Sequence, residues 1–451
     1  MDDDTTEESP FELEPASKKR RGPPVYIYDL GALLRETPQD RDAVRLALKH
    51  GAPLVRRKSR FARGEIDENA ADLVFAFAGL QNNFAIKAFE ERRTAALQAL
   101  LSASPSVATP VLIEQFFVAN YSLAQRVSML NALAGAAREL SGHSVEDGTG
   151  AVQKQTQGLV DDLSNMAISR ARKEGESRAP EIRKEQAVKV TSQRGIRKHP
   201  GAGIQEVTNG GLGAIPRRGA IISRGDERYV NVAGSLFVFP FVNRLLSNIQ
   251  EASSRMSRLG GLSAGYSSSV GSTTARQPPA SAIGWSSTSL FEPFLLAAIL
   301  DTLAVLLYEA RNALDFLAVI APEVMEAALV VVGVALPLSK AFSGGGSSTQ
   351  QDPAGEQRGG DSTDKVAGSA LSLILIILDA SYELDSGTQL LRNRRQLLDD
   401  VGRLASEVFE QQDARARKTT AMGRAGRCSA AVILRLEEIR QNGREQMMRT
   451  M

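Results

Sequence analysis

The chain has 451 residues, enough for two or three ordinary domains, and 43% of them are hydrophobic, which is typical of globular proteins. Its formal net charge of +2 favours no class of partner, and the low aromatic content of 5% favours helices over a β-sandwich. The single cysteine, Cys428, excludes an internal disulfide and indicates a reducing compartment.

Residues 1–24 form a predicted disordered tail that is first acidic and then basic. Thr5 and Ser9 each have a glutamate three residues later, the spacing that an acidophilic kinase such as casein kinase 2 uses. They are therefore candidate phosphoacceptors, although we favour a tail that only keeps the chain soluble. A short basic run that is a candidate nuclear-import signal consists of Lys18, Lys19, Arg20 and Arg21.

Residues 25–141 have helical periodicity and form the first predicted helical block. Thr37 and Pro38 predict the start of one helix, and Gly51 predicts its end. A second long helix is predicted over 86–101 from its apolar spacing.

A third helix in this block has the clearest boundaries. Ser122 and Gln125 have the spacing of a capping box, and Gly142 predicts the end of the helix. Apolar positions from Leu123 to Ala137 recur every three or four residues, so we expect one buried face.

Residues 142–228 contain no Phe, Tyr or Trp, and 168–198 hold ten Lys and Arg against four Glu. We therefore predict a disordered basic insertion. The segments predicted after it are a helical segment at 229–250, a Ser/Gly-rich loop at 251–289, a helical block at 290–341, a flexible linker at 342–364 and a C-terminal helical block at 365–442. Gly443 is predicted to end the last helix.

Successive helices without turns typical of strands predict an all-α fold, a HEAT-like helical-repeat domain (α-solenoid) with long disordered insertions. No fixed repeat period is present in the sequence. The most apolar stretches, 294–307 and 324–338, are shorter than a membrane span, so we interpret them as buried helices and expect no membrane partner.

The sequence offers no convincing catalytic, metal or cofactor site. Gly261, Ser263 and Gly265 match the nucleophile-elbow pattern, but that motif needs a histidine after the serine. His50, His143 and His199 all precede it. Three scattered histidines and one cysteine give no metal-ligand spacing, and no glycine cluster has the context of a phosphate-binding loop. We therefore predict that the chain is not an enzyme.

Several apolar stretches follow the acidic tail in a distinctive order: PPVYIYDLGALLRE (23–36), VRLALKHGAPLVRRK (44–58), FAGLQNNFAIKAFEERRTAALQALL (77–101), FFVANYSLAQRVSMLNALAGAARELSG (116–142), YVNVAGSLFVFPFVNRL (229–245) and FLLAAILDTLAVLLYEARNA (294–313). Together with the helices from 366 to 441, they resemble the conserved C-terminal domain of the telomere length regulation protein family. No single stretch is a catalytic fingerprint, and the order of the stretches along the chain makes the resemblance specific.

The resemblance implies a co-chaperone scaffold that works with two helical-repeat partner proteins. Such scaffolds support the folding and stability of phosphatidylinositol-3-kinase-related kinases. They link these kinases to heat-shock protein 90 through a phosphorylation-dependent adaptor, in the cytoplasm and the nucleus. Telomere length, DNA-damage signalling and TOR signalling then depend on the abundance of the kinases.

Two features depart from the family pattern. A large N-terminal helical-repeat region precedes this domain in the family, whereas this sequence starts within the acidic linker. The family's adaptor-binding motif is a serine among aspartates, and the sequence DDDTTEES only approximates it.

An alternative function is direct binding of telomeric DNA through the basic segment 168–198. That segment lacks aromatic residues for base stacking, and its glutamates dilute the positive charge. We therefore prefer the scaffold, with nucleic acid as the second interpretation.

Overall fold

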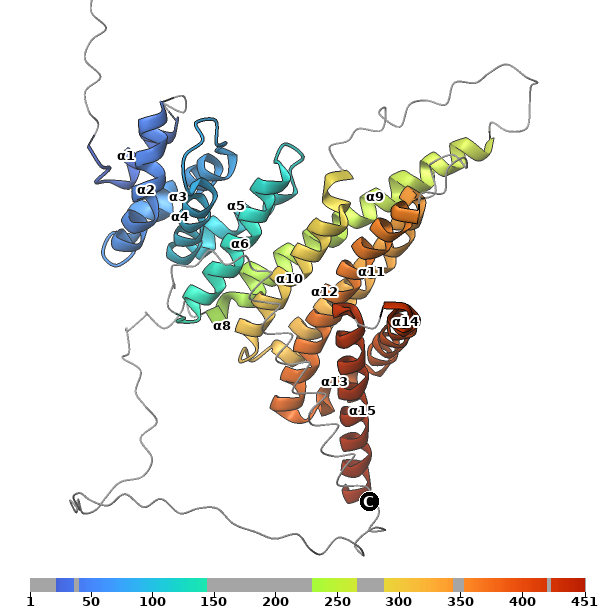
Figure 1. Cartoon of the computed structure of the whole chain (residues 1–451). Helices are drawn as coiled ribbons and strands as arrows, with labels where there is room; N and C mark the ends of the chain where they lie inside the picture. The colour runs from blue at the N-terminus through green and yellow to red at the C-terminus, as the bar shows by residue number, and fades with distance from the viewer. Residues whose placement is uncertain are drawn as a thin grey trace, which may run out of the picture.

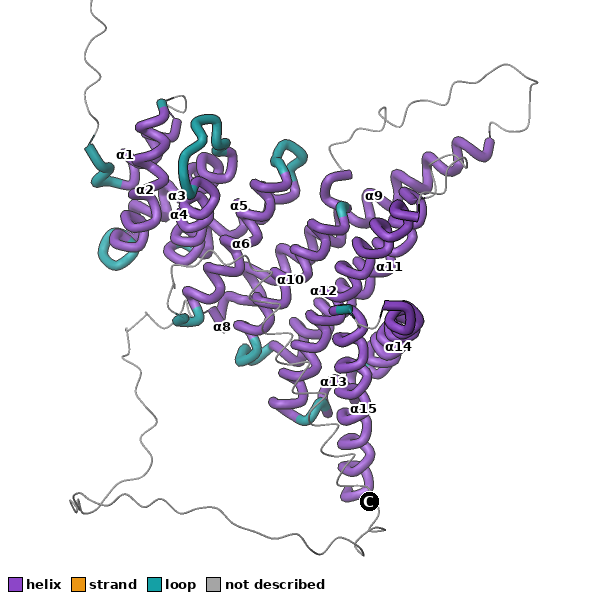
Figure 2. The backbone as a smooth tube through the Cα atoms, in the orientation of Figure 1, coloured by secondary structure: helices purple, strands orange, loops and turns teal. Residues whose placement is uncertain are grey.

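The computed structural model describes residues 22–35, 40–143, 229–265, 288–343, 353–419 and 423–450. Every regular element in these residues is helical, and Figure 2 shows no strand among them. The all-α prediction is therefore confirmed. The predicted tail up to residue 21 and the basic insertion from residue 144 onward lie outside the described residues.

The long helices alternate along the chain between two packed layers, as the stacked helical pairs of an α-solenoid do. The first layer consists of α1 (Ile27–Arg35), α3 (Arg63–Gly79), α5 (Pro105–Phe117), α9 (Phe239–Gly265), α11 (Ala321–Ser343) and α14 (Arg395–Thr419). The second layer consists of α2 (Arg41–Lys58), α4 (Phe89–Ala103), α6 (Leu123–Leu140), α10 (Pro293–Ala310), α12 (Pro353–Asp385) and α15 (Arg424–Thr450). Each helix packs against the next one in its layer. Figure 1 shows α1 and α2 at one end of the array and α14 and α15 at the other.

Short helical elements connect these layers. They are α8 (Tyr229–Val232), the π-helix η1 (Ala233–Val238), the 3-10 helix η3 (Thr288–Phe291), the π-helix η4 (Phe316–Ile320) and α13 (Thr388–Asn393). The aromatic stretch that opens with α8 is helical, and its buried residues Tyr229, Ala233, Phe237 and Phe241 recur every four positions. Tyr229, Phe237 and Phe241 are all fully buried, and the Phe241 ring lies 5.5 Å from that of Phe116 in α5.

Helices α6 and α10 form the most extensive contact between the first block and the rest of the chain, beside that of α5 with α9 and η1. Ala134 of α6 packs against Val305 of α10 in a small apolar cluster of its own. The main hydrophobic core extends continuously from Ile27 in α1 to Ile439 in α15. The array is therefore held by one core, even though residues 144–228 separate its two parts in the sequence.

Helix α10 has apolar residues on all sides because α6 and α12 cover it from two directions. Of its 18 residues, all but Pro293, Phe294 and Tyr308 are buried. The interpretation of the apolar stretch 294–307 as a buried helix is therefore confirmed.

Among the described residues, four helical segments are long and apolar enough to cross a membrane by length and composition alone: Tyr229–Ser254, Pro293–Ala310, Phe316–Val334 and Asp364–Asp385. In the apolar windows of the second and fourth segments, 83% of the residues are buried inside the protein. The corresponding shares are 39% for the first and 50% for the third. The exposed side of the first segment carries the polar residues Asn243, Arg244 and Ser247.

The predicted boundaries of α6 are confirmed. The Ser122 Oγ accepts a hydrogen bond from the Gln125 N–H at 3.3 Å, and the Gln125 Oε1 accepts one from the Ser122 N–H at 2.8 Å. These two bonds form the complete capping box. Gly142 has a φ of +87°, the left-handed conformation that commonly follows a helix end.

Two other glycines do not end helices, and these predictions were wrong. Gly51 lies inside α2, and a Cβ there would be 3.1 Å from the Cζ of Phe77 in α3. Gly443 lies inside α15, where a Cβ would be 2.3 Å from the Cδ2 of Leu391. In both cases, the missing side chain allows a neighbouring element to approach the helix closely.

Three further boundaries differ from the prediction. The N-cap of α2 is Asp40, whose side chain accepts a hydrogen bond from the Asp42 N–H, rather than Thr37. Helix α9 continues to Gly265 in the predicted Ser/Gly-rich loop, and α12 begins at Pro353 in the predicted linker. Packing fixes the buried part of each long helix, and adding further turns then costs little free energy.

The buried face of α6 gives a first test of the packing. Leu130 is only 1% exposed, so we expect Leu130→Asp to lower the free energy of unfolding by about 4 kcal/mol, because it buries an unpaired carboxylate. Leu123→Asp is the matched control, since Leu123 is 39% exposed and begins the same helix, where an acid is favourable. Thermal melting measures both variants, and an unchanged melting temperature for Leu130→Asp would contradict the packing.

A second test concerns the turn between α12 and α13. Gly387 has a φ of +78°, and a Cβ there would lie 2.6 Å from two side-chain carbons of Ile439. We expect Gly387→Ala to destabilise the protein by about 2 kcal/mol. Gly333→Ala in α11 should instead be neutral or stabilising by roughly 0.5–1 kcal/mol, because no atom lies within 4 Å of its added Cβ. Chemical denaturation of both variants checks this difference.

Candidate protein-interaction surface

The candidate phosphoacceptors and basic segments predicted from the sequence are not among the residues that the structure describes. Thr5, Ser9, the basic run at 18–21 and the basic segment 168–198 all lie outside the described residues. Their roles therefore stay predictions.

The nucleophile-elbow pattern is placed by the structure in a helix. Gly261, Ser263 and Gly265 belong to the last turns of α9, which follows a helix and not a strand. That context does not expose a serine on a sharp turn between a strand and a helix, as the motif requires. In the described part of the chain, no group of three or more His, Cys, Asp or Glu side chains could hold a metal ion.

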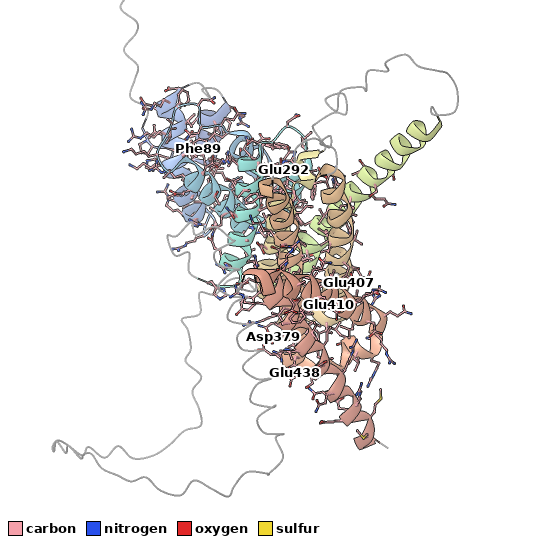
Figure 3. All side chains as sticks on the ribbon, turned by 45° about the vertical axis from the view of Figure 1, so that its right-hand side comes forward. Phe89, Glu292, Asp379, Glu407, Glu410 and Glu438 are labelled. Atoms are coloured by element: carbon pink, nitrogen blue, oxygen red, sulfur yellow. The ribbon has the colours of Figure 1, made fainter. Side chains whose placement is uncertain are left out.

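Most of the buried charges in the second layer hold helices together. Arg435 of α15 is 1% exposed and pairs with Asp379 of α12 and Glu438 of its own helix, two acids that lie close together in Figure 3. Its guanidinium also stacks over the Tyr382 ring, 4.5 Å from the ring centre. These contacts satisfy the charge inside the protein and fix how α12 meets α15.

Asp301 forms a second buried link of this kind. It is 2% exposed in α10 and lies 3.0 Å from the Arg424 Nη2 at the start of α15. Burial raises the pKa of the Asp301 carboxyl, and the Arg424 charge opposes part of that rise. This pair connects two helices that both pack on α12.

Two buried arginines in the first block satisfy backbone carbonyls. Arg126 donates hydrogen bonds to the carbonyls of Val118 at 2.9 Å and Tyr121 at 3.3 Å, just after the end of α5. Arg93 donates to the Leu80 carbonyl at 2.8 Å and also pairs with Glu90. A positive charge is favourable near the negative, C-terminal end of a helix, so both arginines stabilise the helix ends whose carbonyls they contact.

Both ends of the segment 144–228 are attached near the end of α10. On the incoming side, the Nδ1 of His143 lies 3.3 Å from the Oε2 of Glu309. On the outgoing side, the hydroxyl of Tyr229 donates to the Leu306 carbonyl at 3.1 Å. Leu306 and Glu309 are three residues apart and so lie about one helical turn apart. His143 and Tyr229, the described residues on either side of 144–228, therefore lie close together on the array.

The N-terminal end of the array contains a different kind of cluster, which we call the N-terminal corner. It comprises Tyr26, Lys58, Phe61 and Glu65, with Arg57 and Arg60 beside them in the chain. Glu65 of α3 is its centre: the Oε1 accepts the Ile27 N–H at 2.7 Å, and the Oε2 accepts the Lys58 Nζ at 2.9 Å. One carboxylate thus ties α1, α2 and α3 together.

The electrostatics of the N-terminal corner follow from these bonds. Burial raises the pKa of the Glu65 carboxyl, but the hydrogen bonds from Lys58 and Ile27 and the Lys58 charge outweigh it, so the pKa lies below its ordinary value. The carboxylate is therefore charged near neutral pH and neutralises Lys58.

The aromatic side chains of the N-terminal corner are exposed. Tyr26 is 58% exposed and Phe61 is 70% exposed. Both rings nevertheless face the same ammonium, because the Lys58 Nζ lies 4.8 Å from the Tyr26 ring centre and 5.9 Å from that of Phe61. The rings are thus held in place on the surface.

Arg57 and Arg60 supply the charge of the N-terminal corner. Both are exposed, and neither has an ion-pair or hydrogen-bond partner within the described residues. The N-terminal corner therefore combines aromatic rings that contact one ammonium with two arginines that have no partner in the described part of the chain, the composition that protein–protein hot spots favour.

Sequence reasoning missed the N-terminal corner. The stretch VYIYDL was noticed only for its place in a family pattern, although Tyr26 and Tyr28 flank a fully buried Ile27. That arrangement, with aromatic residues on both sides of a core residue, was the available signal. The contribution of Phe61 depends on how α2 meets α3, which no local pattern reveals.

Comparison with known proteins covers the first block of the array. The family model described as telomere length regulation protein matches residues 24–137. The chain is also similar to the DNA replication checkpoint protein tel2 of Schizosaccharomyces pombe, with 29% identity over 141 residues. That alignment covers 31% of this chain and 16% of the relative. No solved structure matches the chain.

The matched residues coincide with structural elements. Residues 24–137 begin just before α1, include the N-terminal corner and end within α6. The match thus includes the three helix pairs α1–α2, α3–α4 and α5–α6, apart from the last residues of α6. Over this part of its sequence, the chain is similar to the telomere length regulation protein family.

Proposed function

We propose that the chain is a non-enzymatic co-chaperone scaffold in the telomere length regulation family. With two helical-repeat partner proteins, it would support the folding, assembly and stability of phosphatidylinositol-3-kinase-related kinases. Heat-shock protein 90 would join through a phosphorylation-dependent adaptor, in the cytoplasm and the nucleus. Telomere length regulation and checkpoint and TOR signalling would follow from the amount of folded kinase.

The observation that carries this proposal is the two-layer helical array whose first block matches the family. Stacked helix pairs leave a long surface on each layer, which suits binding to other elongated helical proteins. The described residues contain no metal cluster, and the one serine motif lies in a helix, so binding explains them better than catalysis does.

A telomeric DNA-binding role remains the second candidate because of the basic segment 168–198. DNA binding through that segment would lose affinity steeply as salt rises, because each phosphate contact releases counterions. The DNA-binding role therefore requires residues 168–198, whereas the scaffold role does not.

The deciding experiment is a pull-down of the tagged chain from native extract at moderate salt, with mass spectrometry and a nuclease-treated duplicate. We expect recovery of two helical-repeat proteins together with kinase clients. Recovery of the two proteins without kinases would assign client binding to sequence beyond this chain. Nucleic acid that nuclease removes, without either partner, would favour the DNA-binding role.

Deletion of residues 168–198 separates the two roles without disturbing the fold. His143 and Tyr229, which flank residues 144–228, both contact the last turns of α10, and shortening a connection between two such fixed points changes its closure entropy by less than about 1 kcal/mol. We expect an unchanged melting temperature and unchanged recovery of the partners. Loss of partner recovery in a normally folded deletion variant would count against the scaffold proposal.

A further inference from the structure

We propose that the N-terminal corner binds an acidic peptide segment of a partner protein, one that carries an apolar side chain among its carboxylates. This inference goes beyond the scaffold function, because it concerns a surface that neither the family match nor the relative's name assigns. It is tested with the purified chain alone, so its failure and that of the proposed scaffold are distinguishable.

The aromatic part of the surface is already ordered before any partner binds. Tyr26 is fixed by its N–H, which donates to the Asp29 Oδ2 at 3.1 Å, and by the neighbouring Ile27, which is fully buried. Phe61 follows the end of α2, where its N–H donates to the Lys58 carbonyl at 3.1 Å. These bonds fix the backbone at both residues, and Lys58 contacts both rings, so the rings lose less conformational entropy on binding than free side chains would.

The charges of the N-terminal corner select an acidic partner. Its carboxylates are already used inside the chain: Glu65 by Lys58 and the Ile27 N–H, and Asp29 by the Tyr26 N–H. Nearby, Asp67 lies 3.7 Å from Arg63. Arg57 and Arg60 are exposed and have no such partner within the described residues. The surface therefore offers positive charge that an added carboxylate can pair.

The apolar requirement follows from the rings. Acidic residues alone would pair with the two arginines but leave Tyr26 and Phe61 in water. An aliphatic or aromatic side chain between the carboxylates would cover the rings and exclude water from the ion pairs, which strengthens them. A nucleic acid fits less well, because two free cations replace few of the contacts that a phosphate backbone needs.

The experiment measures fluorescence anisotropy of a labelled peptide, EEFEEL, titrated with the full chain. We expect saturable binding that weakens at least fivefold as salt rises from about 50 to about 300 mM. The peptides QQFQQL and EEAEEA should each bind at least tenfold more weakly. Equal binding of all three peptides would overturn the proposal.

Matched variants locate the site. Arg57→Glu with Arg60→Glu should weaken binding at least tenfold, and Phe61→Ala at least fivefold. The control, Arg41→Glu with Arg45→Glu, makes the same charge change on α2, and Arg45 lies about 18 Å from Arg57 along the helix axis. Phe75→Ala controls for loss of an exposed ring, since Phe75 is 47% exposed on α3. Circular dichroism confirms that each variant is folded.

Each outcome decides the proposal. Loss of binding only in the N-terminal-corner variants supports it. Loss in the control variants as well, or in none of them, overturns it. A further variant changes Glu7, Glu8, Glu12 and Glu14 to Gln. If the peptide binds only to this variant, the chain's own acidic segment occupies the surface, and the proposal is overturned.

Discussion

The contact between α6 and α10 is the interaction on which the rest of the array depends. Helix α6 is covered by α4 on one side and by α10 on the other, and small buried residues such as Ala134 and Ala136 let the helices approach closely. Arg138 and His143 meet Glu309 of α10 at the edge of this contact. Without this packing, mainly the contacts of α5 with α9 and η1 would join the helices up to α6 to those from α8 onward.

This constraint explains how one core accommodates long insertions. A helix in a stacked array needs its layer neighbours, whereas the connection between them only has to span the gap. Residues 144–228 can therefore vary in length and charge while α6 still packs on α10. The same reasoning applies to α12, whose buried residues from Val366 to Ala380 lie against α10 and α15, whatever sequence joins it to α11.

Local patterns predicted the fold class well because capping and helical periodicity act within a few residues. The capping box at Ser122 and the left-handed Gly142 needed no tertiary information, and both were predicted. Gly51 and Gly443 were misjudged because their purpose is close contact with Phe77 and Leu391, which are distant in the sequence. The N-terminal corner was missed for the same reason, since its rings meet Lys58 only after three helices have packed.

The arrangement of charges separates residues that build the array from residues that are free to act on other molecules. Arg93 and Arg435 are buried, and each has a carboxylate partner within the fold, while Arg126 caps the end of α5 through two carbonyls. Removing any of them would disturb helix packing. Arg57 and Arg60 form no such ion pair or hydrogen bond within the described residues, so the packing of one helix on another does not depend on them. Exposed arginines that hold no helix to another are free to pair with a second molecule, which is the role that the proposal gives them.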